Sequence, residues 1–185
     1  MSEKVEFFQA LDSQNKCGIL SEKYELSLEL ENISLSDYSP NVVRSSEDIA
    51  RMVFSPLHID EDGTIKAAAF DDVRDKGLSV HRLKYTKSET LKIIGDAMAS
   101  NAVEAGRSHR DYIGYVKALT EDIRKLMEGE QRLFCVYDTA KEEEKSHADV
   151  CAVLLVSDNP NLGKKAANKK RRKRLQELFS PLITN

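Results

Sequence analysis

Four side chains in this sequence belong to residue types that could act together on an anion. Arg51, His58 and Arg82 stand among turn-forming residues in one stretch, and His147 opens a strand-like run much later. An arginine offers a planar fork of donors that matches a phosphate or a carboxylate, and a histidine exchanges a proton near neutral pH. In an enzyme acting on a nucleotide or an RNA phosphodiester, His58 and His147 would divide the roles of general base and acid, while the arginines stabilised phosphoryl charge. That hypothesis requires both histidines at one anion site.

The same stretch also has purely structural interpretations. His58 and His147 are each of a type that is more often a satisfied structural residue than a catalytic one. His81 alternates with apolar neighbours on an expected strand and is predicted to lie at the surface, and His109 to extend a basic loop. Residues 60–63, which end in Asp-Gly, are typical of a hairpin turn. A zinc site would need a third ligand that the spacing does not supply, so we predict no metal and no cofactor.

The strongest charge signal is a basic segment near the C-terminus. Removing its +8 from the net charge of −3 leaves the other 174 residues at −11, so charge is strongly segregated along the chain. Such a cluster predicts affinity for anions, with strong salt dependence and little sequence preference if the anion is a nucleic acid. Eight of the eleven residues 164–174 are basic: Lys164, Lys165, Lys169, Lys170, Arg171, Arg172, Lys173 and Arg174.

Several anions fit this segment: RNA, DNA, an acidic protein or an acidic membrane surface. Its first half has no apolar stripe, which disfavours insertion into a membrane. Six Tyr, six Phe and no Trp argue against a stacking platform for single strands, so backbone contacts would dominate binding to a nucleic acid. The segment could also dock on the acidic remainder of the protein, form a merely solvated helix face, or act as a nuclear localisation signal.

The residues of the first stretch occur in an order that resembles a known family. Arg51 is followed by Ser-Pro-x-His, Asp-Gly, Ala-Phe and Gly-Leu-Ser-Val-x-Arg, and a later segment reads His-Ala-Asp-Val. This order resembles a family of small uncharacterised bacterial proteins, over about residues 49–83 and 132–153. The resemblance implies a bacterial cytosolic protein in which both blocks belong to one module, and it brings no activity to transfer.

Patterns along the chain predict the elements that position these residues. Residues 24–31 alternate apolar and polar side chains, which is typical of a half-buried strand. Thr86 and Glu89 form a possible capping box for a helix that ends at Gly106, and Thr120 could cap a second helix that stops at Gly129. Residues 34–46, 138–145 and 157–163 are predicted to be loops or turns. Further strands are expected at 78–83, 112–116, 132–137 and 149–156.

Composition restricts the class of protein. With 41% hydrophobic and 32% charged residues, a chain of 185 residues is an ordinary globular protein with room for a substantial core. No apolar run approaches the ~20 residues that cross a bilayer, and the N-terminus carries acid where a secretory signal is basic. We therefore expect a cytoplasmic protein. Cys17, Cys135 and Cys151 form no C-x-x-C pair and are predicted to be reduced thiols.

These observations predict an α+β protein with a mixed or antiparallel sheet, several helices and a C-terminal basic helix. Residues 1–163 are expected to form a single domain and residues 164–185 the basic helix, whose distal half packs on that domain. The favoured function is a binding module for an anionic partner, above all a nucleic acid. The alternatives are the small enzyme with the His/Arg site, and a protein-interaction module of the antitoxin or adaptor type.

Overall fold

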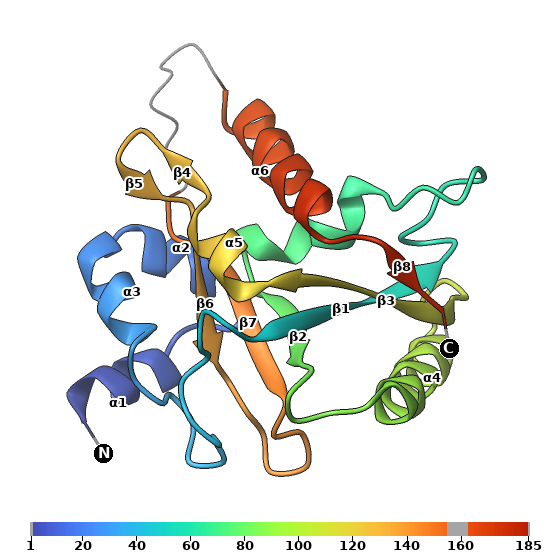
Figure 1. The fold of residues 1–185 in the computed structure, drawn as a ribbon, viewed down its shortest axis with the longest axis horizontal. Helices are drawn as coiled ribbons and strands as arrows, with labels where there is room; N and C mark the ends of the chain where they lie inside the picture. The colour runs from blue at the N-terminus through green and yellow to red at the C-terminus, as the bar shows by residue number, and fades with distance from the viewer. Residues whose placement is uncertain (1, 155–162, 185) are drawn as a thin grey trace.

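The computed structural model of the chain describes residues 2–154 and 163–184, and these fold around one large antiparallel sheet (Figure 1). The strand order across the sheet is β6-β7-β2-β1-β3-β8. The predicted α+β class is confirmed, and the sheet is antiparallel rather than mixed. Its strands are β1 (Asp48–Ser55), β2 (Leu78–Arg82), β3 (Asp111–Leu119), β6 (Phe134–Asp138), β7 (His147–Ala152) and β8 (Leu182–Ile183), and β4 (Met127–Glu128) pairs with β5 (Gln131–Arg132) in a separate hairpin.

Helices of very different lengths surround the sheet. Three short helices precede the first strand, and two longer ones follow β2 and β7 in the chain. The helices are α1 (Glu3–Gln9), α2 (Lys16–Ser21), α3 (Tyr24–Leu30), the 3-10 helix η1 (Ala67–Arg74), α4 (Ser88–Glu104), α5 (Thr120–Arg124) and α6 (Lys164–Leu178).

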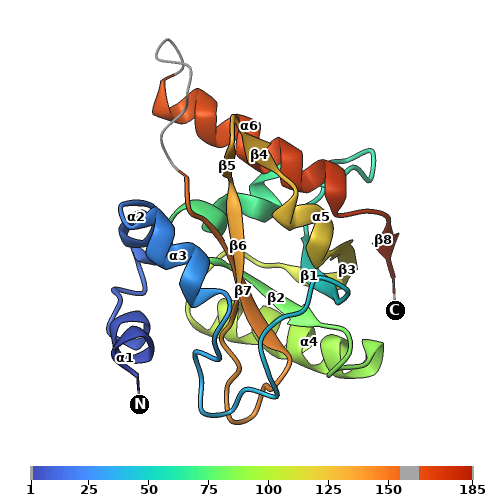
Figure 2. The ribbon, with the colours of Figure 1, turned by 60° about the vertical axis from the view of Figure 1, so that its left-hand side comes forward.

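The two faces of the sheet carry different helices. One face packs with η1, α5 and α6 around the main core, which includes Val80, Val136 and Val150 (Figure 2). On the other face, α1–α3 cover β6 and β7 through residues such as Leu20, and α4 covers β1 and β3 through residues such as Leu91. The strand β2 lies between β7 and β1, so its side chains on this second face lie between α1–α3 and α4.

Four predicted strands correspond to β2, β3, β6 and β7, whereas β1 has no counterpart among them. Its apolar residues, at positions 49, 50 and 52–54, do not alternate with polar ones, because both faces of this central strand are covered and only residues 48, 51 and 55 are less than fully buried. The turn predicted at 60–63 is confirmed: Ile59 pairs with Ile65, and Gly63 has a φ of 85°. The turn predicted at 157–163 lies almost entirely outside the described residues.

The strand predicted over residues 24–31 is wrong, because this segment is helix α3. Its leucines and glutamates are strong helix formers, so the propensity opposes the alternating pattern. The fully buried side chains in the helix, Ser27 and Leu30, are spaced by three residues. The Ser27 hydroxyl donates to the Leu20 carbonyl at 2.6 Å and so joins α3 to α2. Helix packing against α1 and α2 decides the conformation here.

Helix α4 confirms the predicted helix but not the predicted capping. Lys87 is its N-cap residue and makes no side-chain cap, and the buried Thr86 hydroxyl has no partner among the described residues. Gly95 faces the sheet, where a Cβ would lie 2.4 Å from the ring of Tyr112, so glycine permits the close approach of α4 to β3. The second predicted helix is α5, which is shorter than expected. Thr120 is its first residue and not its cap, and Gly129 lies in the turn of the β4–β5 hairpin.

The C-terminal segment is built into the domain. Leu175 and Phe179 belong to the main core, and the Phe179 ring centroid lies 5.4 Å from that of Phe70 in η1. Beyond α6, β8 pairs with β3 at Tyr115 and Val116. The distal half of the basic helix therefore packs on the rest of the protein, and the final residues complete the sheet.

Candidate functional site

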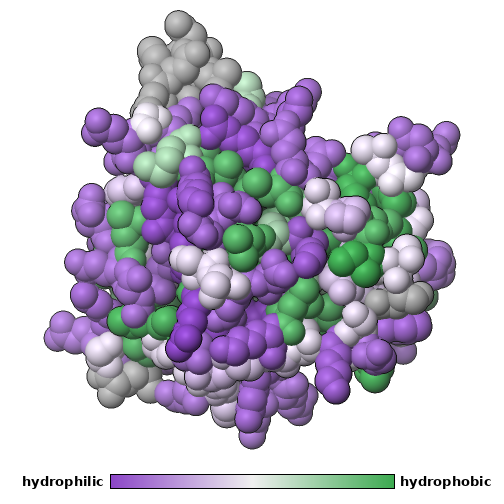
Figure 3. Space-filling view, viewed as in Figure 1, coloured by the Kyte–Doolittle hydropathy of each residue, from purple (hydrophilic) through white to green (hydrophobic). Residues whose placement is uncertain are grey.

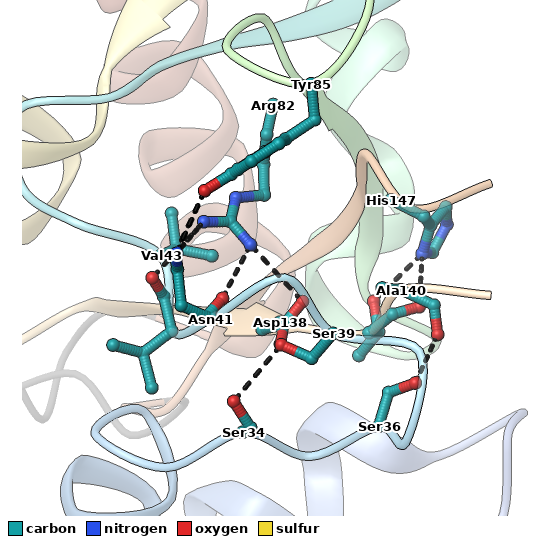
Figure 4. A network of polar contacts seen from close by, with 12 residues as sticks. Ser34, Ser36, Ser39, Asn41, Val43, Arg82, Tyr85, Asp138, Ala140 and His147 are labelled. Atoms are coloured by element: carbon teal, nitrogen blue, oxygen red, sulfur yellow. Dashed lines mark hydrogen bonds and ion pairs between the residues drawn. The ribbon is translucent and has the colours of Figure 1, made fainter. Parts of the chain in front are cut away.

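The guanidinium of Arg82, one of the predicted anion ligands, binds groups of the protein itself. Its guanidinium donates to both Glu47 carboxylate oxygens at 2.8 and 2.9 Å, and it also binds Asn41 and lies 3.4 Å from Asp138 Oδ1. Figure 4 shows it reaching toward Asn41 and Asp138 beside the ring of Tyr85. With 0% of its surface exposed, Arg82 ties the loop before β1 to β2. The expected role in holding an external anion is therefore replaced by a structural one.

The buried Arg82 cluster also sets the ionisation of its carboxylates. Burial raises the pKa of Glu47, but hydrogen bonds from Arg82 and from the Arg44 N–H outweigh it and bring that pKa below its ordinary value. For Asp138 burial dominates and raises the pKa, although the Ser39 hydroxyl and Arg82 oppose it. Glu47 is therefore charged at neutral pH, and it pairs with Arg82.

Arg51 lies on the opposite face of the sheet from the helices α1–α4, where it donates hydrogen bonds to η1 and β2. Its Nε donates to the Ala69 carbonyl at 3.0 Å and its Nη1 to the Ser79 carbonyl at 3.1 Å. A third nitrogen lies 3.9 Å from Asp72 Oδ2. Burial lowers the pKa of Arg51, with the carboxylates of Asp72 and Asp149 opposing. Its donors hold η1 against β2.

His58 belongs to the turn that follows β1. The imidazole Nδ1 of His58 accepts a hydrogen bond from the Phe54 backbone N–H at 3.3 Å, and the backbone N–H of His58 donates to the Phe54 carbonyl at 2.7 Å. Burial, helped by the cation of Arg51, lowers the pKa of His58 from 6.5 to about 4. The imidazole is neutral at pH 7 and closes the turn.

The register of the sheet separates His58 from His147. His147 pairs with His81, which pairs with Ala50 on β1, while His58 contacts Phe54, four residues further along that strand. At about 3.3 Å per residue and about 4.8 Å between strands, the two sites lie roughly 13 Å apart along β1 and two strands apart across it. The structure does not bring the two predicted histidines to one anion.

His147 instead lies within a row of polar side chains on β2 and β7. Ser79 pairs with Asp149 and His81 pairs with His147, so all four side chains emerge on the face between α1–α3 and α4. We call Ser79, His81, His147 and Asp149 the polar strip. His147 Nε2 lies 2.8 Å from Ser79 Oγ and 4.0 Å from Asp149 Oδ1. The strip concentrates a hydroxyl, two imidazoles and a carboxylate.

The prediction that His81 lies at the surface is wrong, because only 1% of it is exposed. Its Nδ1 lies 3.3 Å from Glu144 Oε1 and 3.4 Å from Ser146 Oγ, on the loop between β6 and β7. Its Nε2 is buried without a hydrogen-bond partner among the described residues. Burial lowers the pKa of His81 to about 4, although Glu144 opposes the shift. The loop before β7 covers this side chain, which strand alternation alone does not indicate.

Asp149 connects the polar strip to α2. Lys16 Nζ donates to Asp149 Oδ2 at 2.6 Å, and this carboxylate raises the pKa of Lys16 although burial by itself lowers it. Lys16 also lines a cavity of about 430 Å³, together with Thr139. Ser79, Asp149 and Lys16 are absent from the predicted site. The i,i+2 spacing of Ser79 with His81 and of His147 with Asp149 is the sequence signal that could have found the strip.

The prediction of reduced thiols is confirmed, since Cys17, Cys135 and Cys151 are all free and buried. Burial raises the pKa of the Cys135 thiol to about 12 and that of Cys151 well above its ordinary value. These thiols pack in the core between α1–α3 and the strands β6 and β7.

In the basic helix α6, the arginines and the lysines lie in different surroundings. Ala167, Arg171, Leu175 and Phe179 are buried at four-residue spacing and form the side that packs on the domain. Arg171 Nη2 lies 3.7 Å from Glu128 Oε2, Arg172 pairs with Asp71, and Arg174 donates to the Met127 carbonyl at 2.6 Å. The three arginines thus bind the β4–β5 hairpin and η1. For this part of the basic segment, the structure shows docking on the rest of the protein, which was one of the alternatives for the segment.

The lysines of α6 are arranged differently. Four of them, which we call the lysine face, are exposed, and hydrophilic side chains gather over α6 in Figure 3. Lys170 Nζ lies 3.9 Å from Glu128 and Lys173 Nζ lies 4.0 Å from Glu177, both in exposed positions where ion pairs are weak. Lys164 belongs to the helix, but its side chain is outside the described set. The lysine face consists of Lys165, Lys169, Lys170 and Lys173.

No protein-family model, no curated protein and no solved structure matches this chain. The resemblance to a family of small bacterial proteins therefore stays a prediction. Within residues 2–154 and 163–184, no helix is long and apolar enough to cross a membrane. The same residues contain no group of three or more His, Cys, Asp or Glu side chains placed to hold a metal ion.

Proposed function

We propose that the protein binds the phosphates of a nucleic acid through the lysine face of α6. The observation that supports this most directly is the separation of the two cation types on one helix. Arg171, Arg172 and Arg174 contact the domain, whereas the four lysines are exposed. A helix held by Leu175 and Phe179 in the core presents these charges at fixed positions.

The dimensions of the lysine face suit a phosphate backbone. Lys165, Lys169 and Lys173 recur every four residues and span about 12 Å along the helix axis. That length corresponds to roughly three to four phosphates of one strand of a duplex. Four like charges so close together repel one another, and neutralising phosphates relieves this repulsion. Compact, strongly hydrated ammonium groups recognise charge rather than base identity, so weak sequence preference is expected.

The decisive experiment compares two variants of equal charge in the full-length protein. One variant replaces the lysine face by glutamine (K165Q, K169Q, K170Q and K173Q), and the matched control replaces four exposed lysines elsewhere (K76Q, K87Q, K125Q and K145Q). Binding to a labelled RNA hairpin and to double-stranded DNA is measured by fluorescence anisotropy between about 50 and 200 mM salt.

For the native protein, the plot of log affinity against log salt for duplex DNA should have a slope of up to about −3.6, since each neutralised phosphate contributes about −0.9. The lysine-face variant should lose that slope together with most of the affinity, while the control keeps both. Equal losses in the two variants would contradict the proposal, because binding would then depend on total charge and not on the lysine face. No binding to either nucleic acid at low salt would also contradict it and would leave an acidic protein as the partner to test.

The alternative of a phosphodiester enzyme that uses Arg51, His58, Arg82 and His147 receives no support from this geometry. Both arginines donate to protein groups, and the two histidines lie on different parts of the sheet. The alternative of an adaptor for an acidic protein uses the same lysine face, and the experiment above separates it from nucleic-acid binding.

A further inference from the structure

The closest contact within the polar strip joins a hydroxyl to an imidazole. Ser79 Oγ lies 2.8 Å from His147 Nε2, and the two residues belong to the neighbouring strands β2 and β7. A serine within hydrogen-bond distance of a histidine, whose ring is held by a third group, is the arrangement that activates a hydroxyl nucleophile. Two further observations decide whether the imidazole can act as the base: the position of its proton and its charge.

The surroundings of His147 fix its proton on Nδ1. This nitrogen lies 3.0 Å from the backbone carbonyl of Thr139, which can only accept a hydrogen bond, and 2.9 Å from the Thr139 hydroxyl. The Nδ1–H therefore donates to Thr139, and in the neutral ring Nε2 carries a lone pair. Ser79 must then be the donor in its contact with Nε2. Burial lowers the pKa of His147, with Asp149 opposing, so the ring is neutral at pH 7.

Ser79 is accessible while its base is protected. Its surface is partly exposed, whereas His147 is only 6% exposed. The cavity of about 430 Å³ adjoins the strip through Thr139, which binds His147, and Lys16, which binds Asp149. Apolar side chains such as Phe8, Leu11 and Leu35 also line it. Its size lies within the range of about 300–1,000 Å³ that is common for sites of small molecules.

The charges around the strip favour a neutral substrate over a phosphodiester. Asp149 pairs with Lys16 at 2.6 Å and Glu144 pairs with Lys141 at 3.2 Å, so each carboxylate beside the strip has a lysine partner. The two histidines are neutral at pH 7. Because both of these lysines are already paired, they are not free to bind an anionic phosphodiester, whereas an uncharged carboxylic ester needs no cation.

We propose that Ser79 is a nucleophile activated by His147, and that this pair hydrolyses small uncharged carboxylic esters. Ser79 Oγ forms a bond to the ester carbonyl carbon while its proton moves to His147 Nε2. The ester C–O bond then breaks, and the imidazolium returns the proton to the leaving alcohol. Water attacks the acyl-serine with His147 again as base, which releases the carboxylic acid and restores the Ser79 hydroxyl. This activity is independent of the lysine face.

The test uses the full-length protein and a fluorophosphonate probe, which reacts with an activated serine by losing fluoride. In the native chain, peptide mass spectrometry should locate the adduct on Ser79, and heat-denatured protein should give none there. Ser79→Ala should abolish labelling and the hydrolysis of 4-nitrophenyl acetate. Ser100→Ala, at an exposed position on α4, should leave both unchanged.

His147→Asn keeps an N–H for Thr139 but has no base at the Nε2 position, so labelling of Ser79 should slow by about 100-fold or more, in the range of general-base contributions. The proposal is overturned if the native protein acquires no adduct on Ser79 above the denatured level, or if His147→Asn is labelled at the native rate. Because the adduct is mapped in the native chain, this outcome does not depend on the folding of any variant.

Discussion

Arg171 and Glu128 form an ion pair between the buried side of α6 and the β4–β5 hairpin, with 3.7 Å between Nη2 and Oε2. The arginine is 3% exposed, and it stands in the middle of the most basic run of the sequence. Burial lowers the pKa of Arg171 and Glu128 opposes that shift. One of the predicted phosphate ligands is thus a structural residue that fixes the helix from which the exposed lysines project.

Removing the charge of Glu128 should therefore destabilise the protein. Glu128→Gln leaves a buried guanidinium without its anion and should lower the free energy of unfolding by about 1–3 kcal/mol. Glu130→Gln, an exposed position in the same hairpin, is the matched control and should change stability by less than about 0.5 kcal/mol. Urea unfolding followed by circular dichroism measures both. Equal stability of the two variants would show that the Arg171 pair contributes nothing.

The end of α6 should be as sensitive as any core position. Phe179→Ala removes a ring that is 1% exposed and packs on Phe70, and such truncations cost about 3–5 kcal/mol. Lys173→Gln, one turn and a half earlier on the exposed side of the helix, should leave the stability of the protein unchanged. Thermal unfolding of the two variants checks the difference. A chain truncated after residue 163 would lose Leu175, Phe179 and β8, so such a truncation cannot serve as a clean test of nucleic-acid binding.

The secondary structure was predictable where a pattern and a propensity agree. The apolar, β-rich runs at 78–83 and 132–137 are strands, and the helical spacing after Thr86 is a helix. At residues 24–31 an alternating pattern conflicts with the helix propensity of Leu and Glu, and tertiary packing against α1 and α2 decides for helix. β1 was not predicted, because a central strand that is covered on both faces does not alternate apolar and polar residues.

The candidate site depends on register and burial, which no local pattern contains. Ser79 and Asp149 lie 70 positions apart in the sequence and meet because β2 pairs with β7. Arg82 has the residue type of an anion ligand, but its guanidinium contacts Asn41, Glu47 and Asp138, which lie far from it in the sequence. Among the basic residues of α6, helical spacing places Arg171 in line with Ala167 and Leu175, so its burial was open to prediction from the sequence.

The two buried histidines with strongly lowered pKa values should make stability fall in mild acid. The pKa values of His58 and His81 are lowered from 6.5 to about 4 in the folded protein. Between about pH 4 and 6.5 the unfolded chain binds protons that the folded chain does not, so stability rises with pH in this window. Each histidine contributes up to about 1.4 kcal/mol per pH unit to the slope.

His58→Gln and His81→Gln should each flatten the pH dependence of the free energy of unfolding between pH 4 and 6.5, whatever their stability at pH 7. Ser108→Ala, in an exposed loop, removes no titratable group and should leave the slope of the native protein unchanged. Urea titrations at several pH values measure the slope. A steeper dependence in either buried-histidine variant would contradict the assigned direction of the pKa shifts.

The pH dependence of Ser79 labelling should report the ionisation of His147. Burial lowers the pKa of this imidazole, Asp149 and Glu144 raise it, and Lys141 lowers it; His81 faces it as a neutral ring, and Lys16 is paired with Asp149. The labelling rate should fall with a midpoint below pH 6.5, where Nε2 becomes protonated.

Asp149→Asn removes a carboxylate that favours the imidazolium, so the midpoint for labelling should move to lower pH while the rate at high pH remains measurable. Asp96→Asn, an exposed position on α4 where the carboxylate pairs with Lys92, should leave the midpoint unchanged. Rates of fluorophosphonate labelling between about pH 4 and 8 give both midpoints, a range set by the ordinary histidine pKa. A midpoint that rises in Asp149→Asn, or that moves equally in Asp96→Asn, would show that His147 is not the group whose protonation controls Ser79.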